Sequence, residues 1–174
     1  MQQIFLETQR MFLRRIAPSD FSELCVMLQD KDVMYAWEHT FTDDEVREWI
    51  DRRLAQYDAD GYSYFLAVDK QSGQVVGQMG LLHEEINGES CTGVGWILNK
   101  ACWHMGYATE GAKALINYAV SCLNCTYVVA DIRPENQSSR RVAERLSMKC
   151  TGEFIKYYHG RHMKHLIYTY AKEP

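Results

Sequence analysis

Apolar and polar residues follow two different periods along the chain, and the changes of period divide it into strands and helices. Alternation at every second position, or a short apolar run, predicts a strand, whereas apolar residues at i, i+3, i+4 and i+7 predict an amphipathic helix. By this criterion we expect strands at residues 9–16, 62–69, 74–83, 91–98, 125–132, 152–158 and 163–171. Helices are expected at residues 18–29, 43–60, 109–121 and 136–146.

The order of these elements predicts the fold class. Capping signals support the second helix: Thr42 and Glu45 form a capping box, and Gly61 follows the last turn. The order is strand, two helices, three strands, helix, strand, helix and two strands, which indicates an α/β (α+β) fold with a mixed, twisted sheet. Because no internal repeat or linker is visible, we expect a single domain over residues 1–174.

The composition is that of a globular protein and argues against several functions. Of the 174 residues, 47% are hydrophobic and 24% are charged, and the formal net charge is −4. A mildly acidic chain is a poor partner for nucleic acid and suits cationic ligands such as amines. No apolar run approaches the roughly 18 residues of a membrane span, and no secretory h-region is visible. We therefore expect a cytoplasmic protein, monomeric or homodimeric, without a membrane partner.

The cysteines and the C-terminal histidines do not form a metal-binding pattern. Cys122 and Cys125 have the spacing of a redox pair, but they follow the third helix, where the helix dipole does not lower a thiol pKa. A zinc site would need two more ligands at matching spacing. His162 and His165 lie three residues apart in an expected strand, so their side chains point to opposite faces. We expect free thiols and no metal.

Residues 92–120 combine an apolar strand, a turn containing small residues and the start of a helix. Backbone N–H groups in the first turn of a helix lack partners within the helix, and the helix dipole adds about half a positive charge there. This arrangement is typical of a phosphate-binding site.

Four stretches of the chain, taken in order, resemble one family. Residues 7–14 are similar to its opening strand, and residues 103–110 to a pyrophosphate loop that usually reads W-G-x-G-Y-A-T-E. Asn136-x-x-Ser139 with residues 146–148 is similar to a later helix, and the terminal hairpin also fits. The chain thus resembles the GNAT superfamily of acetyl-CoA-dependent N-acetyltransferases. Within it, the branch resembled is that of the ribosomal-protein N-terminal (alanine/serine) acetyltransferases.

The resemblance implies a fold and a donor site. The sheet would be mostly antiparallel, splayed between the fourth and fifth predicted strands, and flanked by about four helices. Acetyl-CoA would be the acetyl donor, with its pyrophosphate on the loop and its arm beside the fourth strand. The implied cofactor-binding residues are Trp96, Ile97, Leu98, His104, Met105, Gly106, Tyr107, Ala108, Thr109, Asn136 and Ser139.

Three positions depart from the family's pattern. His104 replaces the first glycine of the loop, so one backbone N–H would approach the phosphates less freely. Gly93 replaces a glutamate that many relatives carry on the fourth strand. Ala143 stands where many other members have a tyrosine that protonates the departing thiolate. The resemblance therefore supports the donor site better than it supports an acid–base assignment.

The base must then come from another side chain. Glu84 and Glu85, at the end of the third predicted strand, are candidates, as are Glu38 and His39 in an aromatic segment. Each has an alternative interpretation, because carboxylates near a hairpin are commonly only solvated. Trp37, Glu38 and His39 are also the residues that we expect to bind the acceptor, although Trp37 could equally pack in the core.

Ser139 is the candidate acid, because its hydroxyl could hydrogen-bond the sulfur as the thiolate leaves. A serine in the first turn of a helix can instead simply satisfy backbone groups. Glu110 is expected to turn away into a structural bond, because a carboxylate beside pyrophosphate would repel it.

The implied activity is transfer of acetyl to a primary amine by direct attack in a ternary complex. At pH 7 an α-amine is neutral roughly 10–15% of the time, against on the order of 0.04% for a lysine-type amine, so an α-amine depends less on a strong base. This favours a protein or peptide N-terminus as acceptor. The alternatives are a small-molecule amine (polyamine, aminoglycoside or amino-acid-like) and a non-catalytic acyl-CoA-binding sensor domain.

Overall fold

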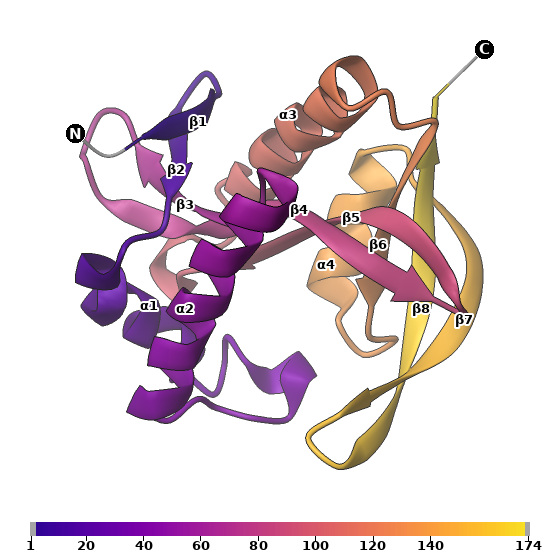
Figure 1. The fold of residues 1–174 in the computed structure, drawn as a ribbon, viewed down its shortest axis with the longest axis horizontal. Coiled ribbons are helices and arrows are strands. Elements are labelled where there is room, and N and C mark those ends of the chain that lie inside the picture. The colour runs from indigo at the N-terminus through magenta and orange to yellow at the C-terminus, as the bar shows by residue number, and fades with distance from the viewer. Residues whose placement is uncertain (1–2, 173–174) are drawn as a thin grey trace.

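The structure, a computed structural model, describes residues 3–172 as one eight-stranded sheet with helices on both faces (Figure 1). The strands are β1 (Ile4–Glu7), β2 (Met11–Arg15), β3 (Tyr64–Asp69), β4 (Val75–Ile86), β5 (Glu89–Leu98), β6 (Tyr127–Ile132), β7 (Lys149–Tyr158) and β8 (Arg161–Ala171). The α-helices are α1 (Phe21–Leu28), α2 (Asp43–Asp60), α3 (Tyr107–Cys122) and α4 (Gln137–Arg145). The strand order is β1-β2-β3-β4-β5-β6-β8-β7.

The fold class that the sequence predicts is confirmed, down to four helices and a mixed, mostly antiparallel sheet. The sequence pattern does not reveal β1, which pairs antiparallel with β2. The two ends of β1, Ile4 and Glu7, are exposed, so the alternation that marks a half-buried strand is missing there. The helix starts also differ slightly, because α1 begins at Phe21 after a short 3-10 turn and α3 begins at Tyr107.

The splay between β5 and β6 creates the space for a site. These two strands are parallel and pair at one position in the described chain, where Gly93 lies opposite Val129. On its other side β5 pairs antiparallel with β4 along its whole length. Beyond Gly93 the two parallel strands separate, so residues 94–98 have no ladder partner on β6. This is the splay predicted between the fourth and fifth strands.

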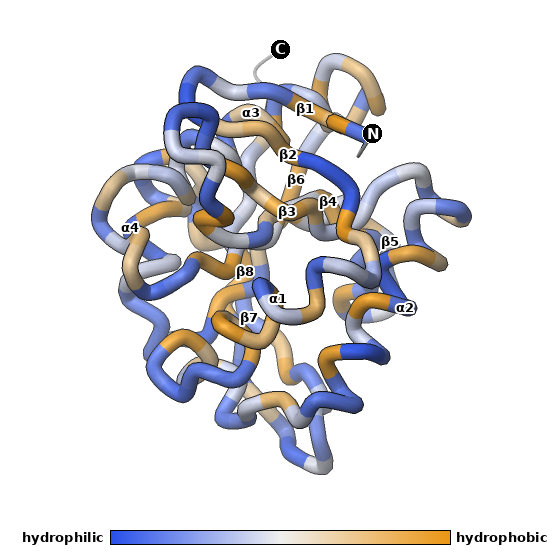
Figure 2. The backbone as a smooth tube through the Cα atoms, turned by 90° about the vertical axis from the view of Figure 1, so that its left-hand side faces the viewer, coloured by the Kyte–Doolittle hydropathy of each residue, from blue (hydrophilic) through white to orange (hydrophobic). Residues whose placement is uncertain are grey.

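Alternate residues of β3 point into two different cores. Phe65 and Ala67 pack in the core beneath α3 and α4, whereas Tyr64 and Leu66 pack in the core beneath α1 and α2. Because β3 is covered on both faces, it is apolar along most of its length. Figure 2 shows the hydrophobic colour on the central strands β3 and β4 and hydrophilic segments in the outer loops.

The cap of α2 fixes the segment that precedes this helix. The Thr42 hydroxyl accepts a hydrogen bond from the Glu45 backbone N–H at 3.3 Å, and the Glu45 carboxylate accepts one from the Thr42 N–H at 2.7 Å. Gly61 ends the helix with φ of 80°, a left-handed conformation that favours glycine. Both ends of α2 thus match the sequence prediction, and residues 35–41 are anchored where α2 begins.

All six cysteines lie within the described residues and are free, as the sequence predicts. In the described part of the chain, none of the helices has the length and apolar character needed to cross a membrane.

Candidate active site

Two cavities adjoin where β5 and β6 separate. The larger cavity, of about 260 Å³, is lined by residues of α2, the splayed strands and the β7–β8 hairpin. The smaller cavity, of about 190 Å³, is lined by the end of β5, the loop before α3 and the start of α4. Four residues line both cavities: Trp37, Trp96, Asn136 and Ser139. The two cavities therefore share a wall at the N-terminal end of α4.

The smaller cavity gathers most of the residues that the sequence assigns to the cofactor. All of them line it except Met105 and Tyr107. The Met105 side chain is 53% exposed. The Tyr107 side chain turns the other way, and its hydroxyl donates a hydrogen bond to Asp69 Oδ2 at 2.9 Å. Of Tyr107, only the backbone is therefore left to bind the cofactor.

The loop before α3 has the backbone conformation that its glycine motif implies. Gly106, the N-cap of α3, has φ of 82°, and His104 has φ of 62°. Both angles are left-handed, which explains why glycine is usual at these two positions. His104 adopts the same conformation in spite of its side chain, at a cost in strain. The substitution of the first glycine thus preserves the shape of the loop.

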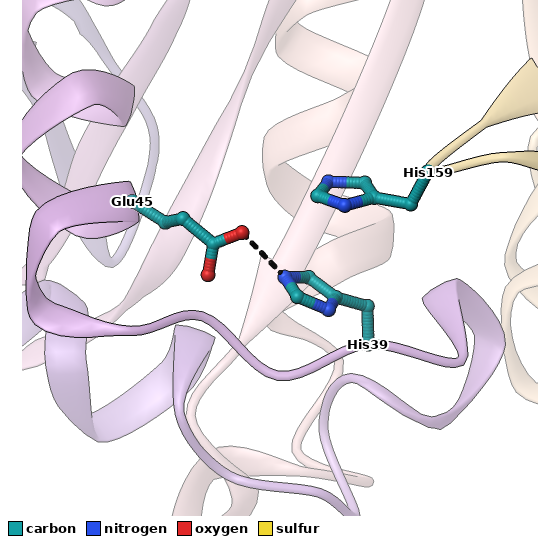
Figure 3. Close-up of side chains that lie close together, drawn as sticks. All are labelled: His39, Glu45 and His159. Carbon is teal, nitrogen blue, oxygen red and sulfur yellow. Dashed lines mark hydrogen bonds and ion pairs between the residues drawn. The ribbon is translucent and has the colours of Figure 1, made fainter.

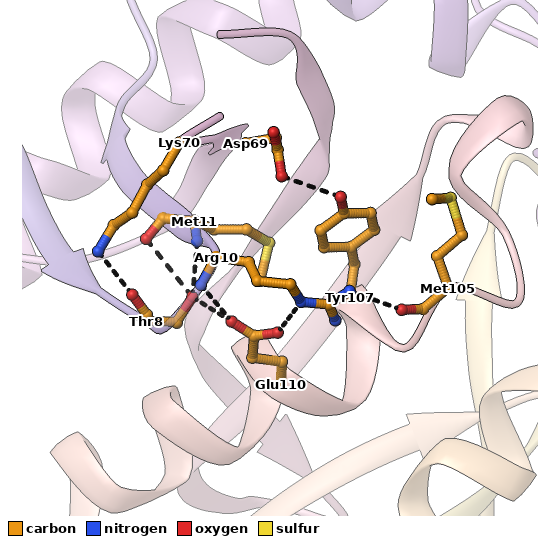
Figure 4. A network of polar contacts seen from close by, with 8 residues as sticks. All are labelled: Thr8, Arg10, Met11, Asp69, Lys70, Met105, Tyr107 and Glu110. Atoms are coloured by element: carbon orange, nitrogen blue, oxygen red, sulfur yellow. Dashed lines mark hydrogen bonds and ion pairs between the residues drawn. The ribbon is translucent and has the colours of Figure 1, made fainter. Parts of the chain in front are cut away.

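A network of polar contacts joins this loop and the first turn of α3 to the turn between β1 and β2 (Figure 4). Glu110 accepts hydrogen bonds from the Thr8 hydroxyl at 2.7 Å, the Arg10 N–H at 2.8 Å and Arg10 Nε at 2.6 Å. Arg10 also donates to the Met105 carbonyl at 3.0 Å. Burial alone would raise the pKa of Glu110, but the hydrogen bonds from Thr8 and Arg10 hold it below its ordinary value. Glu110 thus makes the structural bond that the sequence predicts.

Asn136 and Ser139 stand at the shared wall. The Asn136 side-chain oxygen caps α4 by accepting from the Ser139 N–H at 3.1 Å, and it also accepts from the Tyr35 hydroxyl at 3.0 Å. Trp96 Nε1 donates to the Ser139 hydroxyl oxygen at 3.2 Å. The indole thus fills an acceptor position of the hydroxyl, whose proton is free to point into either cavity.

Two arginines in the smaller cavity are absent from the sequence prediction. Arg141 and Arg145 are exposed residues of α4 that line the cavity opposite the loop before α3. Their spacing of four places them on one helix face, a signal that the sequence does contain. Unpaired helix-start N–H groups, a free strand edge and two guanidinium groups fit an elongated anionic ligand such as coenzyme A.

The larger cavity contains two carboxylates, Glu84 and Asp131, that both contact Lys156. Lys156 Nζ lies 2.7 Å from Asp131 Oδ2 and 3.4 Å from Glu84 Oε2. Burial raises the pKa of the Glu84 carboxyl, and the charge of Asp131 raises it further, while Lys156 opposes both. Burial alone would lower the pKa of Lys156, but the charges of Asp131 and Glu84 raise it. Asp131 and Lys156 come from distant segments, and the sequence patterns give no signal for either.

Gly93 and Glu84 are sterically linked. A Cβ atom added at Gly93 would lie 2.7 Å from Glu84 Cγ, closer than real Cβ contacts. The glycine that replaces the family's strand glutamate therefore leaves the space that the Glu84 side chain occupies. A carboxylate is retained beside β5, but it is supplied by the neighbouring strand β4.

Of the other residues predicted to bind the acceptor or act as the base, only one lines a cavity. Trp37 lines both cavities, and its role in binding the acceptor stays a prediction. Glu85 is exposed and lines neither cavity, and in the pleat of β4 it faces the side opposite to Glu84. Glu38 and His39 also stay outside both linings. The structure therefore does not bring Glu85, Glu38 or His39 to the cavities.

Glu38 and His39 instead connect two segments. Glu38 forms ion pairs with Arg133 at 2.9 Å and with Arg161 at 2.7 Å, and these hydrogen bonds hold the pKa of Glu38 below its ordinary value. The His39 ring stacks on His159 with centroids 4.2 Å apart. We call these five residues the clasp, because they join the segment before α2 to the β7–β8 hairpin and to Arg133, which follows β6.

The histidines of the clasp lie beside Glu45, and the possible ligand atoms of His39, Glu45 and His159 lie within 4.8 Å of one another (Figure 3). The two rings are nearly parallel, at 25°, instead of converging on a common point. Glu45 is already bonded to His39 at 2.8 Å and to the Thr42 N–H. The geometry is that of a packing contact between loop and hairpin.

Comparisons with known proteins identify the class to which this fold and site belong. The family model of the acetyltransferase (GNAT) domain matches residues 10–149. The chain therefore belongs to the GNAT family of acetyltransferases, and it is an acyltransferase of the N-acetyltransferase type.

Individual relatives agree with this assignment. The chain is 31% identical over 144 residues to the uncharacterized protein YkkB of Bacillus subtilis (strain 168), covering 82% of this chain and 84% of YkkB. A GNAT-family acetyltransferase from Bacillus anthracis superposes with a TM-score of 0.81 at 24% identity, covering 97% and 98% of the two chains. RimL, a ribosomal L7/L12 α-N-protein acetyltransferase solved with coenzyme A, superposes with a TM-score of 0.76 at 19% identity, covering 97% and 98%. At these identities the two solved structures establish the fold.

Proposed function

We propose that this protein transfers the acetyl group of acetyl-CoA to a primary amine by direct attack in a ternary complex. The observation that carries the proposal is the wall shared by the two cavities at Trp96 and Ser139. A donor in the smaller cavity and an acceptor in the larger cavity would meet at that wall. Direct transfer then needs no covalent enzyme intermediate. The coenzyme A bound to the similarly folded RimL supports the choice of donor.

The donor would be held mainly by main-chain groups. The pyrophosphate would accept hydrogen bonds from backbone N–H groups of residues 104–109 at the start of α3. The pantetheine arm would pair with the free edge of β5, at residues 94–98, as an added strand does. A main-chain N–H of this edge could also polarise the thioester carbonyl. Asn136 would contact the arm from the opposite side of the splay.

Glu84 is the general base in this proposal. A base for an amine works best with a pKa near the working pH, and burial with the charge of Asp131 raises the pKa of Glu84 in that direction. Asp131 stays paired with Lys156 at 2.7 Å, which leaves Glu84 as the less tightly paired carboxylate. Ser139 would donate its hydroxyl proton to the departing sulfur, with Trp96 holding the hydroxyl oxygen.

The acceptor is a primary amine, for which the sequence favours a peptide N-terminus. RimL is named as an α-N-protein acetyltransferase, which supports that choice by analogy of fold. The clasp favours the alternative of a small-molecule amine, because it ties the segment before α2 to the β7–β8 hairpin and to Arg133 at the edge of the larger cavity. A peptide would have to pass or open this contact. The cytoplasmic location, the single domain and the monomeric or homodimeric state stay predictions from the sequence.

The test is thiol release from acetyl-CoA with a panel of amines, combined with initial-rate analysis. We expect turnover that depends on both substrates, with intersecting double-reciprocal lines, and thermal protection of the fold by acetyl-CoA. Parallel lines would contradict direct transfer. Protection without turnover on any amine would favour the sensor domain, and no protection would contradict the donor site.

A further inference from the structure

Arg53 is a buried arginine of α2 in the larger cavity. The residue is 7% exposed. Its Nε is buried and has no hydrogen-bond partner. No acidic residue within 3–172 forms an ion pair with it. A guanidinium group of this kind is costly to bury unless something accepts its hydrogen bonds.

Two aromatic rings fix the position of this group. The guanidinium carbon of Arg53 lies 4.1 Å from the ring centre of Trp49 and 5.6 Å from that of Tyr64. Ring faces stabilise a cation, but they do not replace the in-plane acceptors that its N–H donors need. Burial lowers the pKa of Arg53 to about 10, so the side chain keeps its charge at neutral pH. The aromatic residues thus hold a charged group whose Nε has no hydrogen-bond partner among residues 3–172.

The charges of the larger cavity suit a ligand that carries both signs. Lys156 bridges Asp131 and Glu84 and neutralises one of these two carboxylates. Arg133 also lines the cavity, but it is paired with Glu38. One carboxylate charge and the Arg53 charge then remain on different walls, on β4 and on α2. A polyamine would bring a second cation close to Arg53, which is unfavourable. A zwitterion would place its ammonium group near Glu84 and its anionic group near Arg53.

The size of the cavity points to a small acceptor. Its volume of about 260 Å³ lies just below the range of roughly 300–1,000 Å³ that is typical of sites for drug-sized ligands. Apolar and aromatic side chains, including Trp37, Trp49 and Tyr158, form much of its lining. This space suits one amino-acid-sized molecule.

We infer that the acceptor is an amino-acid-like zwitterion whose carboxylate binds the guanidinium group of Arg53 while its amine faces Glu84. The inference rests on the proposed function and names its substrate class. Arginine and carboxylate form two parallel charge-assisted hydrogen bonds, a geometry that would fix the orientation of the amine. Glu84 would first take a proton from the ammonium group and release it to solvent. The neutral amine nitrogen would then form an amide bond to the acetyl carbon as the C–S bond breaks, and its second proton would pass to Glu84. Coenzyme A would leave as the thiol after taking the Ser139 hydroxyl proton, which solvent would restore.

The first experiment compares matched acceptors with the wild-type protein. Each set contains an L-amino acid, its carboxamide and the decarboxylated amine, with L-phenylalanine, L-phenylalaninamide and phenethylamine as one example. We expect kcat/KM to be about 10- to 100-fold higher for the amino acid than for the other two, the range expected for hydrogen bonds to a charged group. Peptides with neutral N-terminal residues are tested separately, and their kcat/KM should be similar to that of the carboxamide.

The second experiment uses variants of Arg53. Arg53→Gln should raise KM for the amino acid about 10- to 100-fold, leave KM for acetyl-CoA within about twofold and remove the preference over the carboxamide. Arg53→Lys keeps a charge but not the fork, and it should retain part of the preference. The matched control is Arg52→Gln, because Arg52 is the exposed neighbour on α2 and lines neither cavity.

The outcomes separate the inference from the proposed function. If amines are acetylated but the carboxylate makes no difference to kcat/KM, the inference is wrong and the proposed function stands. If peptides are better acceptors than every free amino acid, the inference is also overturned. If no amine is acetylated while acetyl-CoA binds, the proposed function itself fails. The wild-type comparison decides the matter even if Arg53→Gln does not fold.

Discussion

The two cavities that meet at Ser139 differ in how their walls are made. Nearly half of the residues that line the smaller cavity come from one short part of the chain, the end of β5 and the loop and turn that start α3, and the others come from residues 33–37 and from the start and body of α4. The larger cavity is formed by single side chains from α2, β4, β5, β6 and the β7–β8 hairpin. A site made of consecutive backbone can be shared by a family, whereas a site made of scattered side chains can change its ligand one residue at a time.

The largest expected effect comes from the base of the larger cavity. Glu84→Gln should lower kcat/KM by about 100- to 10,000-fold, the usual contribution of general base catalysis, and leave KM for acetyl-CoA nearly unchanged. Lys156 keeps its ion pair with Asp131, so the fold should survive. The measurement is initial rates of thiol release together with a thermal unfolding curve.

The pH profile sharpens this test. Because burial and Asp131 raise the pKa of Glu84, wild-type kcat/KM should fall on the acid side at a higher pH than an ordinary glutamate would give. The base must be ionised, so activity is present above this pKa and lost below it. Glu85→Gln is the control, since Glu85 is exposed on the same strand. Equal losses in the two variants would remove Glu84 from the mechanism.

The sequence predicts much of the smaller cavity and little of the larger one, for a physical reason. A glycine-containing loop before an amphipathic helix implies its own geometry, because φ angles and helix-start N–H groups are local properties. The meeting of Glu84, Asp131 and Lys156 depends on how three strands pack together. Of the predicted bases, Glu84 and Glu85 have the same local signal, and only the pleat of β4 tells them apart.

The second prediction probes the smaller cavity. Gly106→Val should weaken acetyl-CoA binding by about 10- to 100-fold, because a β-branched residue disfavours φ of 82° and displaces the N–H groups of the loop. Strain alone could lower stability, so the matched control is Gly88→Val. Gly88 has φ of 83° and nothing within 4 Å of an added Cβ. Calorimetric titration with coenzyme A should separate them; equal affinity in both variants would contradict this placement of the donor.

The fold, too, could be predicted where the local pattern of apolar and polar residues is clear, and could not be predicted where this pattern is missing. Alternation identifies the strands that cover a core, such as β3, whose successive residues enter two different cores. The exposed ends of β1 carry no such signal. Gly93 shows that a departure from a motif can be misinterpreted when only the sequence is known. The sequence indicates a lost carboxylate, whereas the structure shows that the glycine makes room for Glu84.

A third, smaller effect should arise behind the loop of the smaller cavity. Glu110→Gln weakens the bonds from Thr8 and Arg10 and should lower the free energy of unfolding by about 1–2 kcal/mol at pH 7. Its folded pKa is depressed, so this stability is present above the unfolded value near 4.3 and lost as pH falls through the folded pKa. Urea unfolding at several pH values measures the difference, with Glu144→Gln on the exposed side of α4 as control. A difference independent of pH would contradict the ionic role.

The smallest effect is expected at the wall that the two cavities share. Ser139→Ala should lower kcat about five- to tenfold, equivalent to the loss of one hydrogen bond, and leave both KM values within about twofold. The cap of α4 should persist, because Asn136 accepts from the Ser139 backbone and not from its hydroxyl. Ser138→Ala is the control, since Ser138 lines the smaller cavity alone. A proton donor at the sulfur affects turnover, whereas a purely structural serine would affect stability or binding. A wild-type kcat in Ser139→Ala would therefore return this residue to a structural role and leave the leaving thiolate to be protonated by water.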